Sequence, residues 1–516
     1  IDDSNNKKRK NNMLGKKKFQ PKLFYNLTID DLVDEDNIYR QIDQFLNLRF
    51  VYKECEKLYG NTGKPSIDPV VFFKLELFGY LENIISDREL IRKASDSLAA
   101  RYFIGYDIDE KLPWHSTISR TRGLISKETF ENIFSKILEL CYQTGLIGGK
   151  HQSIDSTLVK ANASLDSLER KEPKLTIKEY ITKTYEENKE EGQLVCVGKG
   201  DVEQKSNEGQ KPELRIENVI EKSAKKKGGS NQDYESKTDP DSRMASKPGK
   251  LSGLYYSTHY SADSKKKVIT DVYTTYADRK DSVVLLEVYE RAEKRLSELG
   301  FTIEGISADK GYCSGKNLRE LEQRGVVAFI PTRRHENKKG VINNKEFIYE
   351  EEKDVFICPN HKELTFYFYD KREQIKRYRA REEDCLECPL KEKCCPKGKR
   401  GSLSRTIYYK EYQRLEQRLQ TPAGRRASRI RKVVSEGLFA EAKMYNGLRK
   451  FMTKGIEKAQ KRSYMIASVQ NIKRLLGDMK RKVRIAVQKV ADILVEPFLL
   501  NKFMFVLITK NNNRVN

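Results

Sequence analysis

Three carboxylates that are far apart in the chain, Asp155, Asp309 and Glu436, lie where regular secondary structure would present them. Asp155 is flanked by β-branched and apolar residues, a composition that predicts a strand. Asp309 ends an apolar run and is followed by Lys-Gly, which predicts a strand and then a turn. Carboxylate oxygens suit hard divalent cations such as Mg²⁺, so these acids suggest a two-metal centre for phosphoryl transfer.

The third acid lies in residues 429–443, a segment whose pattern predicts a helix. At about 100° per residue, steps of four and seven residues return to nearly the same helix face. Lys432 precedes Glu436 by four residues, and Lys443 follows it by seven. The spacing therefore predicts that two cations flank the third carboxylate.

Length and charge limit the class of protein. A chain of 516 residues is too long for one ordinary core, so two to four domains are expected. Its 99 Lys and Arg exceed its 75 Asp and Glu, giving a net charge of +24 that favours a polyanionic partner, most commonly nucleic acid. The alternative is a basic but otherwise ordinary enzyme. The sequence has no apolar run of membrane-spanning length and no signal peptide, which predicts a cytoplasmic, nucleoid-associated protein with no membrane partner.

The beginning of the chain predicts a disordered arm and then helices. Residues 1–22 form a polar, lysine-rich arm, within which Met13 is a plausible true start. Residues 23–147 have a mainly helical pattern. Asp68 followed by Pro69 predicts a capped helix start, and Ser86-Asp-Arg-Glu89 is a capping-box sequence.

A further helix is predicted to begin near Ser116 and to carry Arg120 and Arg122. Two short helices followed by this third one would suit a helix-turn-helix that contacts DNA. The alternative is a helical bundle whose arginines are only solvated.

The order of elements after residue 148 predicts a mixed α/β fold. A charged stretch, residues 168–250, has few apolar residues and predicts a helical arm with a disordered tip. Two alternating runs after Gly253 predict a hairpin, and Val283–Leu299 predicts an amphipathic helix. Strand, helix and strand then follow from Thr302. Antiparallel strands before a βαβ unit match the order of a ribonuclease H-like catalytic core, predicted for residues 148–476 and followed by a basic tail, 477–516.

Five of the nine cysteines lie between Cys358 and Cys395, inside a predicted cysteine-rich, partly β insertion at residues 340–410. Such density in a cytosolic protein favours metal binding over disulfides. One structural Zn²⁺ could be held by Cys358, Cys385, Cys388 and either Cys394 or Cys395, with His361 as a substitute. The alternative is that these thiols are reduced and pack as small apolar groups.

The chain contains a set of short motifs whose order resembles that of a known protein family. They are Asp155-Ser-Thr, Ala308-Asp-Lys-Gly-Tyr312, Glu436-x6-Lys443, Gly447-Leu-Arg-Lys-Phe451, Lys454-Gly455 and Asn471-Ile-Lys-Arg-Leu475. From about Leu23 to Leu476 the chain resembles a bacterial insertion-sequence transposase of the DDE class. One departure is that related transposases often place Tyr and Arg seven and four residues before the glutamate. This chain has Arg429 and Lys432 there, and lysine lacks the bidentate fork of a guanidinium.

The resemblance implies both the chemistry and the DNA contacts. Asp155 would bridge two Mg²⁺ or Mn²⁺ ions, while Asp309 and Glu436 would each hold one. A water would nick the end of the element, and the freed 3′-hydroxyl would attack target DNA. The helical region would help to read the terminal inverted repeats of double-stranded DNA, and copies of the chain would associate in a synaptic complex. The expected DNA-binding residues are Lys443, Lys432, Lys310, Arg120, Arg122, Arg449 and Lys454.

Two other functions stay open at this point. A nuclease with the same ribonuclease H-like fold would cut DNA without joining it. A domesticated or inactive DNA-binding protein would bind DNA without metal-dependent cleavage, although the intact set of three acids argues against it.

Overall fold

A computed structural model describes residues 24, 26–58, 66–171, 231–246, 252–332, 342–396 and 398–512, with side chains as far as residue 487. The predicted arm at residues 1–22 and most of the charged insertion lie outside the described residues. Over the described part of the chain, no helix has both the length and the apolar character needed to cross a membrane.

The first part of the chain is helical, as its pattern predicts. Asp68 caps α4 by accepting hydrogen bonds from the backbone N–H groups of Val70 and Val71, at 2.7 and 3.2 Å. The capping box expected at Ser86 is wrong, because its side chain makes no capping hydrogen bond to α5. The helices are α1 (Ile29–Leu32), α2 (Ile38–Phe45), α3 (Phe50–Cys55), α4 (Pro69–Leu81), α5 (Asp87–Asp96), α6 (Leu98–Ile104), α7 (His115–Leu124) and α8 (Lys127–Gln143).

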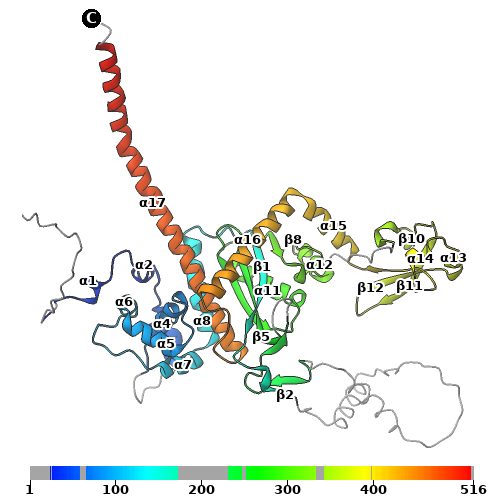
Figure 1. Ribbon diagram of the computed structural model, residues 1–516, viewed down its shortest axis with the longest axis horizontal. Coiled ribbons are helices and arrows are strands. Elements are labelled where there is room, and N and C mark those ends of the chain that lie inside the picture. Colours follow the sequence, from blue (N-terminus) through cyan, green and yellow to red (C-terminus); the bar gives the residue numbers. More distant parts are fainter. Residues whose placement is uncertain are drawn as a thin grey trace, which may run out of the picture.

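A mixed six-stranded sheet forms the centre of the molecule (Figure 1). Its strands run in the order β4-β5-β1-β7-β8, and β6 also pairs with β5. The β5–β6 and β1–β5 pairs are antiparallel, whereas β1–β7 and β7–β8 are parallel. This confirms the predicted hairpin and the strand-helix-strand order. The strands are β1 (His151–Lys160), β4 (Arg243–Ala245), β5 (Gly253–Asp263), β6 (Ile269–Tyr276), β7 (Gly305–Ala308) and β8 (Val327–Phe329).

Helices cover both faces of this sheet. Side chains alternate along a strand, so neighbouring residues of β1 face opposite layers. Asp155 and Thr157 face α16 (Pro422–Tyr445), while Ser156 faces α11 (Asp281–Glu298). Near β8 the chain adds α12 (Gly315–Gln323) and α15 (Tyr409–Gln420).

The long helix α17 (Ile456–Asn512) joins the helical region to the sheet and then extends away from the body (Figure 1). Lys461 of α17 donates to the carbonyl of Ile125 at 2.7 Å, and Gln460 accepts from the backbone N–H of Thr274. One cluster of buried apolar residues runs from Tyr39 through β1 to Leu476. The N-terminal helices therefore share their core with the sheet.

Both ends of the charged insertion form strands, which the sequence pattern did not predict. Strands β2 (Leu168–Arg170) and β3 (Tyr234–Ser236) pair with each other, and β4 extends the central sheet. Asp239 is fully buried, accepting from the hydroxyl of Tyr256 at 2.7 Å and from the backbone N–H of Gly455 at 3.0 Å. These bonds fix the chain just before α17 begins.

A second sheet stands apart from the first (Figure 1). It lies between Asp309 and Glu436, where the sequence predicts a partly β insertion. It has its own small core, formed by Phe347, Phe356, Leu364, Tyr378, Ala380 and Leu403. Its strands, in spatial order, are β13 (Ser402–Thr406), β12 (Ile375–Ala380), β11 (Glu363–Asp370), β10 (Val355–Ile357) and β9 (Ile348–Glu350). Helices α13 (Glu382–Leu386) and α14 (Lys391–Cys394) follow β12.

Candidate active site

The parallel pairing of β1 and β7 brings two of the three predicted acids together. Ile154 lies opposite Ala308 in this pair, so the next residue on each strand is an aspartate, Asp155 or Asp309. Neighbouring strands are about 4.8 Å apart, which places these aspartates side by side at the end of the shared pairing.

One guanidinium group lies between the two aspartates. Nη1 of Arg431 is 3.3 Å from Oδ2 of Asp155, and Nη2 is 3.9 Å from Oδ1 of Asp309. The side chain of Arg431 is only 11% exposed, so this charge is largely shielded from solvent. Sequence reasoning missed Arg431 and considered its neighbours Arg429 and Lys432 instead.

Burial dominates the acid–base behaviour of Asp155. It raises the pKa of this carboxyl group to about 6, and the nearby charges of Asp309 and Asp281 act in the same direction. A hydrogen bond from the backbone N–H of Ser156, at 2.8 Å, and the charge of Arg431 oppose the rise. Asp155 is thus a poorly solvated acid close to other acids, a setting that favours the approach of a cation.

Glu436, the third predicted acid, is on α16 as expected, but it makes no contact with the aspartates. Its side chain is exposed, and no ion pair or hydrogen bond joins it to Asp155 or Asp309 in the described part of the chain. Glu436 follows Arg431 by five residues, which is about 140° around a helix. Arg431 thus reaches the aspartates from one side of α16. Glu436 lies about 20° from Lys443 around the helix, and the amine of Lys443 reaches Thr157 of β1. Among the described residues, no three His, Cys, Asp or Glu side chains are gathered as ligands of one metal ion.

Behind the aspartates, a buried polar network joins the residues that follow each of them. The hydroxyl of Ser156 donates to Asp281 at 3.0 Å, and the hydroxyl of Tyr312 lies 2.7 Å from Nδ1 of His259. Burial, and then the charge of Asp281, raise the pKa of Tyr312 well above its usual value, while a hydrogen bond with Ser156 opposes this rise. This network therefore ties β1, β5, α11 and the turn after β7 together.

Gly311 allows the turn after Asp309 to approach α11 closely. A Cβ atom at Gly311 would lie 2.9 Å from Oδ2 of Asp281, a separation that real Cβ contacts do not reach. The two aspartate motifs thus contain residues with a structural role, namely Ser156, Gly311 and Tyr312. They fix the spacing of the strands that carry the aspartates. Sequence reasoning missed Asp281, whose only signal was its place at the start of an amphipathic helix.

The basic residues predicted to bind DNA are in different settings. Lys443 donates to the hydroxyl of Thr157, two residues beyond Asp155 on the same face of β1. The backbone carbonyl of Lys443 accepts from Nε of Arg449 at 3.0 Å. Exposed side chains that stay available to a polyanion are those of Lys310, Lys432, Arg449, Lys454 and Arg120.

Arg122 is not among them, and the expectation that it binds DNA is wrong. Its side chain is 3% exposed, and its guanidinium group pairs with Glu76 of α4 and with Asp87 of α5, at 2.7 Å for Asp87. Two carboxylates thus neutralise it inside the helical region. Arg120 is two residues away on the same helix and is exposed.

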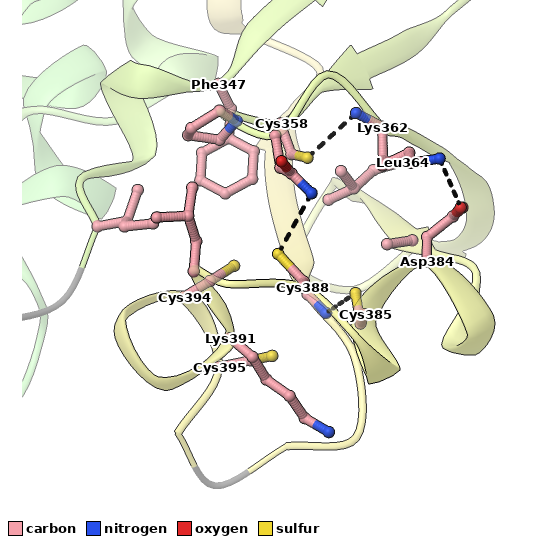
Figure 2. A pocket seen from close by; sticks show the side chains of 16 residues that line it. Phe347, Cys358, Lys362, Leu364, Asp384, Cys385, Cys388, Lys391, Cys394 and Cys395 are labelled. Carbon is pink, nitrogen blue, oxygen red and sulfur yellow. Dashed lines mark hydrogen bonds and ion pairs between the residues drawn. The ribbon is translucent and has the colours of Figure 1, made fainter.

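The five clustered cysteines line one small cavity of about 20 Å³ in the second sheet's core (Figure 2). This volume is near that of one water or ion and is far too small for a substrate. The Cys358 sulfur accepts from the backbone N–H of Lys362 at 3.3 Å, and that of Cys385 accepts from Gly401 at 3.5 Å. Burial raises the pKa of Cys394 to about 11, and the neighbouring cysteines add to this rise. His361 is exposed and is not part of the cavity lining.

Two segments of the chain match family models of known proteins. Residues 27–124 match the family model described as "Transposase domain (DUF772)", and residues 357–476 match the model described as "Transposase DDE domain". The second match spans the cysteine cluster, α16 and the first part of α17. The presence of both matches in one chain supports a DNA transposase of the DDE class.

Other comparisons add little. A search of the curated proteins found no match. One solved structure, described as a "Cryo-EM structure of piggyBac transposase synaptic complex with hairpin DNA (SNHP)", is similar at 12% identity and a TM-score of 0.24. The alignment covers 88% of this chain and 82% of the other. At that TM-score the similarity supports no conclusion about this chain.

Proposed function

We propose that this protein is the transposase of a bacterial insertion sequence, which binds the terminal inverted repeats of its element, cleaves the DNA ends and joins the 3′-hydroxyl to target DNA. The observation that carries the proposal is the register of β1 and β7, which sets Asp155, within β1, beside Asp309, directly after β7. A ribonuclease H-like core is proposed on the same grounds, because three antiparallel strands are followed by two parallel ones.

The proposed metal ligands are Asp155, Asp309 and Glu436. Two carboxylates that flank one cation already fit a divalent ion such as Mg²⁺ or Mn²⁺, because the ion could replace the guanidinium charge between them. Glu436 would complete the set only if α16 turned or shifted toward the sheet. When bound, two such ions stabilise the attacking and leaving oxygens of phosphoryl transfer.

The protein's own residues would hold the DNA and keep the acids in place. Lys443 and Arg449 lie beyond Thr157 on the α16 side of the sheet, where phosphates of a DNA end would approach Asp155. Lys310, Lys432 and Lys454 would add phosphate contacts, and Arg120 would contact the inverted repeat from the helical region. Association of copies in a synaptic complex and a nucleoid location belong to the same proposal.

A structural zinc ion at Cys358, Cys385, Cys388 and Cys394 or Cys395 is also a proposal. Supporting it are the shared cavity and the backbone N–H groups that point at two of the sulfurs. The thiols are not yet gathered as three ligands of one ion, so the metal-bound form would require them to move closer. Such an ion would stabilise the second sheet and take no part in the reaction.

The test of function is cleavage of a labelled duplex that carries the element end, followed by strand transfer from a pre-cut end. Asp155→Asn, Asp309→Asn and Glu436→Gln should each lower cleavage at least ~100-fold, because losing even an outer partner of a metal ligand costs ~10–100-fold. DNA binding should persist. Glu304→Gln is the matched control, an exposed acid just before β7. Cleavage without joining would point to a nuclease, and full activity in an acid variant would remove that residue from the site.

A further inference from the structure

The two faces of the second sheet differ in chemistry. Leu364, Tyr378 and Leu403 point to one face and are buried in the small core beside the cysteines. On β12, Arg377 and Arg379 flank Tyr378 and so point to the other face. On β13, Ser402 and Ser404 lie opposite these two arginines in the strand register. This second face, defined by Arg377, Arg379, Ser402 and Ser404, is here named the open face.

A β-bulge adds two aromatic rings to the open face. Phe366 pairs with Tyr378 and Phe368 pairs with Arg377, so Tyr367 is the extra residue in the β11–β12 ladder. Phe368 shares the face of its partner Arg377. The guanidinium carbon of Arg379 lies 3.6 Å from the ring centroid of Tyr367, which places Tyr367 on this face too. Without the bulge, consecutive side chains would point to opposite faces.

These rings are exposed. Tyr367 and Phe368 are each 47% exposed, and their ring centroids are 6.0 Å apart. Charge surrounds them: Arg379 lies over Tyr367, Arg377 pairs with Asp370 at 3.6 Å, and the next turn carries exposed basic residues, Lys371 and Arg372. The open face therefore combines flat apolar rings with cations on a surface that projects from the body (Figure 1).

We propose that the open face binds unpaired DNA, with bases stacked on Tyr367 and Phe368 and phosphates paired with Arg377 and Arg379. Aromatic rings recognise the faces of bases, which are accessible only where a strand is single or its bases are splayed out. In a duplex those faces are stacked on each other, and only the phosphates would meet the arginines. The proposal rests on the proposed function in one respect, since strand cleavage at an element end creates new strand ends, where bases can unpair.

The experiment measures binding rather than cleavage, so its outcome is separate from that of the proposed function. Fluorescence anisotropy of the full chain would compare a single-stranded oligonucleotide with a duplex of the same length. The double variant Tyr367→Ala/Phe368→Ala should bind the single strand at least ~10-fold more weakly and the duplex as before. The salt dependence of duplex binding should not change, because no charge is removed.

Phe366→Ala is the matched control. Phe366 is on the same strand and is also 47% exposed, but it faces Tyr378 on the other side of the sheet. Phe366→Ala should leave single-strand binding unchanged. The variant Tyr367→Trp/Phe368→Tyr, which keeps an aromatic ring at both positions, should bind the single strand as the unaltered protein does. Unchanged single-strand affinity in the double-alanine variant would overturn the proposal. So would equal losses for the duplex, or a loss of self-association measured by light scattering, which would assign the face to contacts between copies.

Discussion

The guanidinium group of Arg431 lies 3.3 Å from the carboxylate of Asp155, an ion pair that joins α16 to the central strand of the sheet. The same guanidinium also reaches Asp309, so it lies between two acids. A divalent cation, which is also positively charged, would take the same position. Arg431 and a metal ion should therefore compete. When displaced, the arginine would be close enough to the acids to pair with a DNA phosphate instead.

We expect Arg431→Gln to bind Mn²⁺ more tightly in the absence of DNA, by about 3- to 10-fold, because a competing charge is removed while both carboxylates remain. Cleavage should nevertheless fall if Arg431 also holds a phosphate. Titration calorimetry with Mn²⁺ would measure the affinity, and Lys432→Gln is the control, since this neighbouring cation is exposed. Weaker Mn²⁺ binding by Arg431→Gln would contradict competition and indicate that the arginine supports the ligand geometry.

Metal binding should depend on pH through Asp155. Burial raises the pKa of Asp155 to about 6, so in the metal-free protein this carboxyl group gains a proton as the pH falls through that value. Metal requires the ionised form, hence the Mn²⁺ affinity should be constant above about pH 7 and fall up to ~10-fold per pH unit well below 6. An ordinary exposed aspartate would show this fall only below about pH 4.

Calorimetric titrations from pH 5 to 8 would measure this dependence. Asp155→Asn should bind more weakly and lose the dependence near pH 6, whereas Glu304→Gln should retain it. An affinity that stays constant down to pH 5 in the unaltered protein would show that Asp155 titrates as a solvated acid.

The sequence predicts the strands and the helix that carry the acids, because alternation in β1 and the apolar end of β7 are local signals. It could not predict which side of α16 meets the sheet. That orientation comes from packing, such as the stacking of Phe439 on Tyr260 with ring centroids 4.6 Å apart, between residues far apart in the chain. The sequence therefore did not show that Arg431 of α16 would contact the aspartates. The sequence could not predict the open face either, because this face depends on a bulge in the β11–β12 pair.

The cysteine cavity gives a prediction that does not depend on catalysis. Protein purified without chelator should carry about one zinc per chain, measured by elemental analysis, and Cys385→Ser/Cys388→Ser should lower both the zinc content and the unfolding temperature. The control is Cys313→Ser, since Cys313 is outside the cavity. If zinc-free protein unfolds at the same temperature with or without added Zn²⁺, these cysteines are reduced thiols that pack as small apolar groups.

Arg120 and Arg122 should separate DNA binding from stability. Arg122 is buried between Glu76 and Asp87, so Arg122→Ala leaves the buried carboxylate of Glu76 without its cation and should destabilise the protein by about 3–5 kcal/mol. Arg120 is exposed, and Arg120→Ala should change stability by less than about 0.5 kcal/mol. Urea unfolding would measure both changes, and binding to the element end would be compared at a temperature where both variants are folded. We expect Arg120→Ala to weaken binding and folded Arg122→Ala to bind normally. The reverse result would mean that Arg122 leaves its ion pairs when DNA binds.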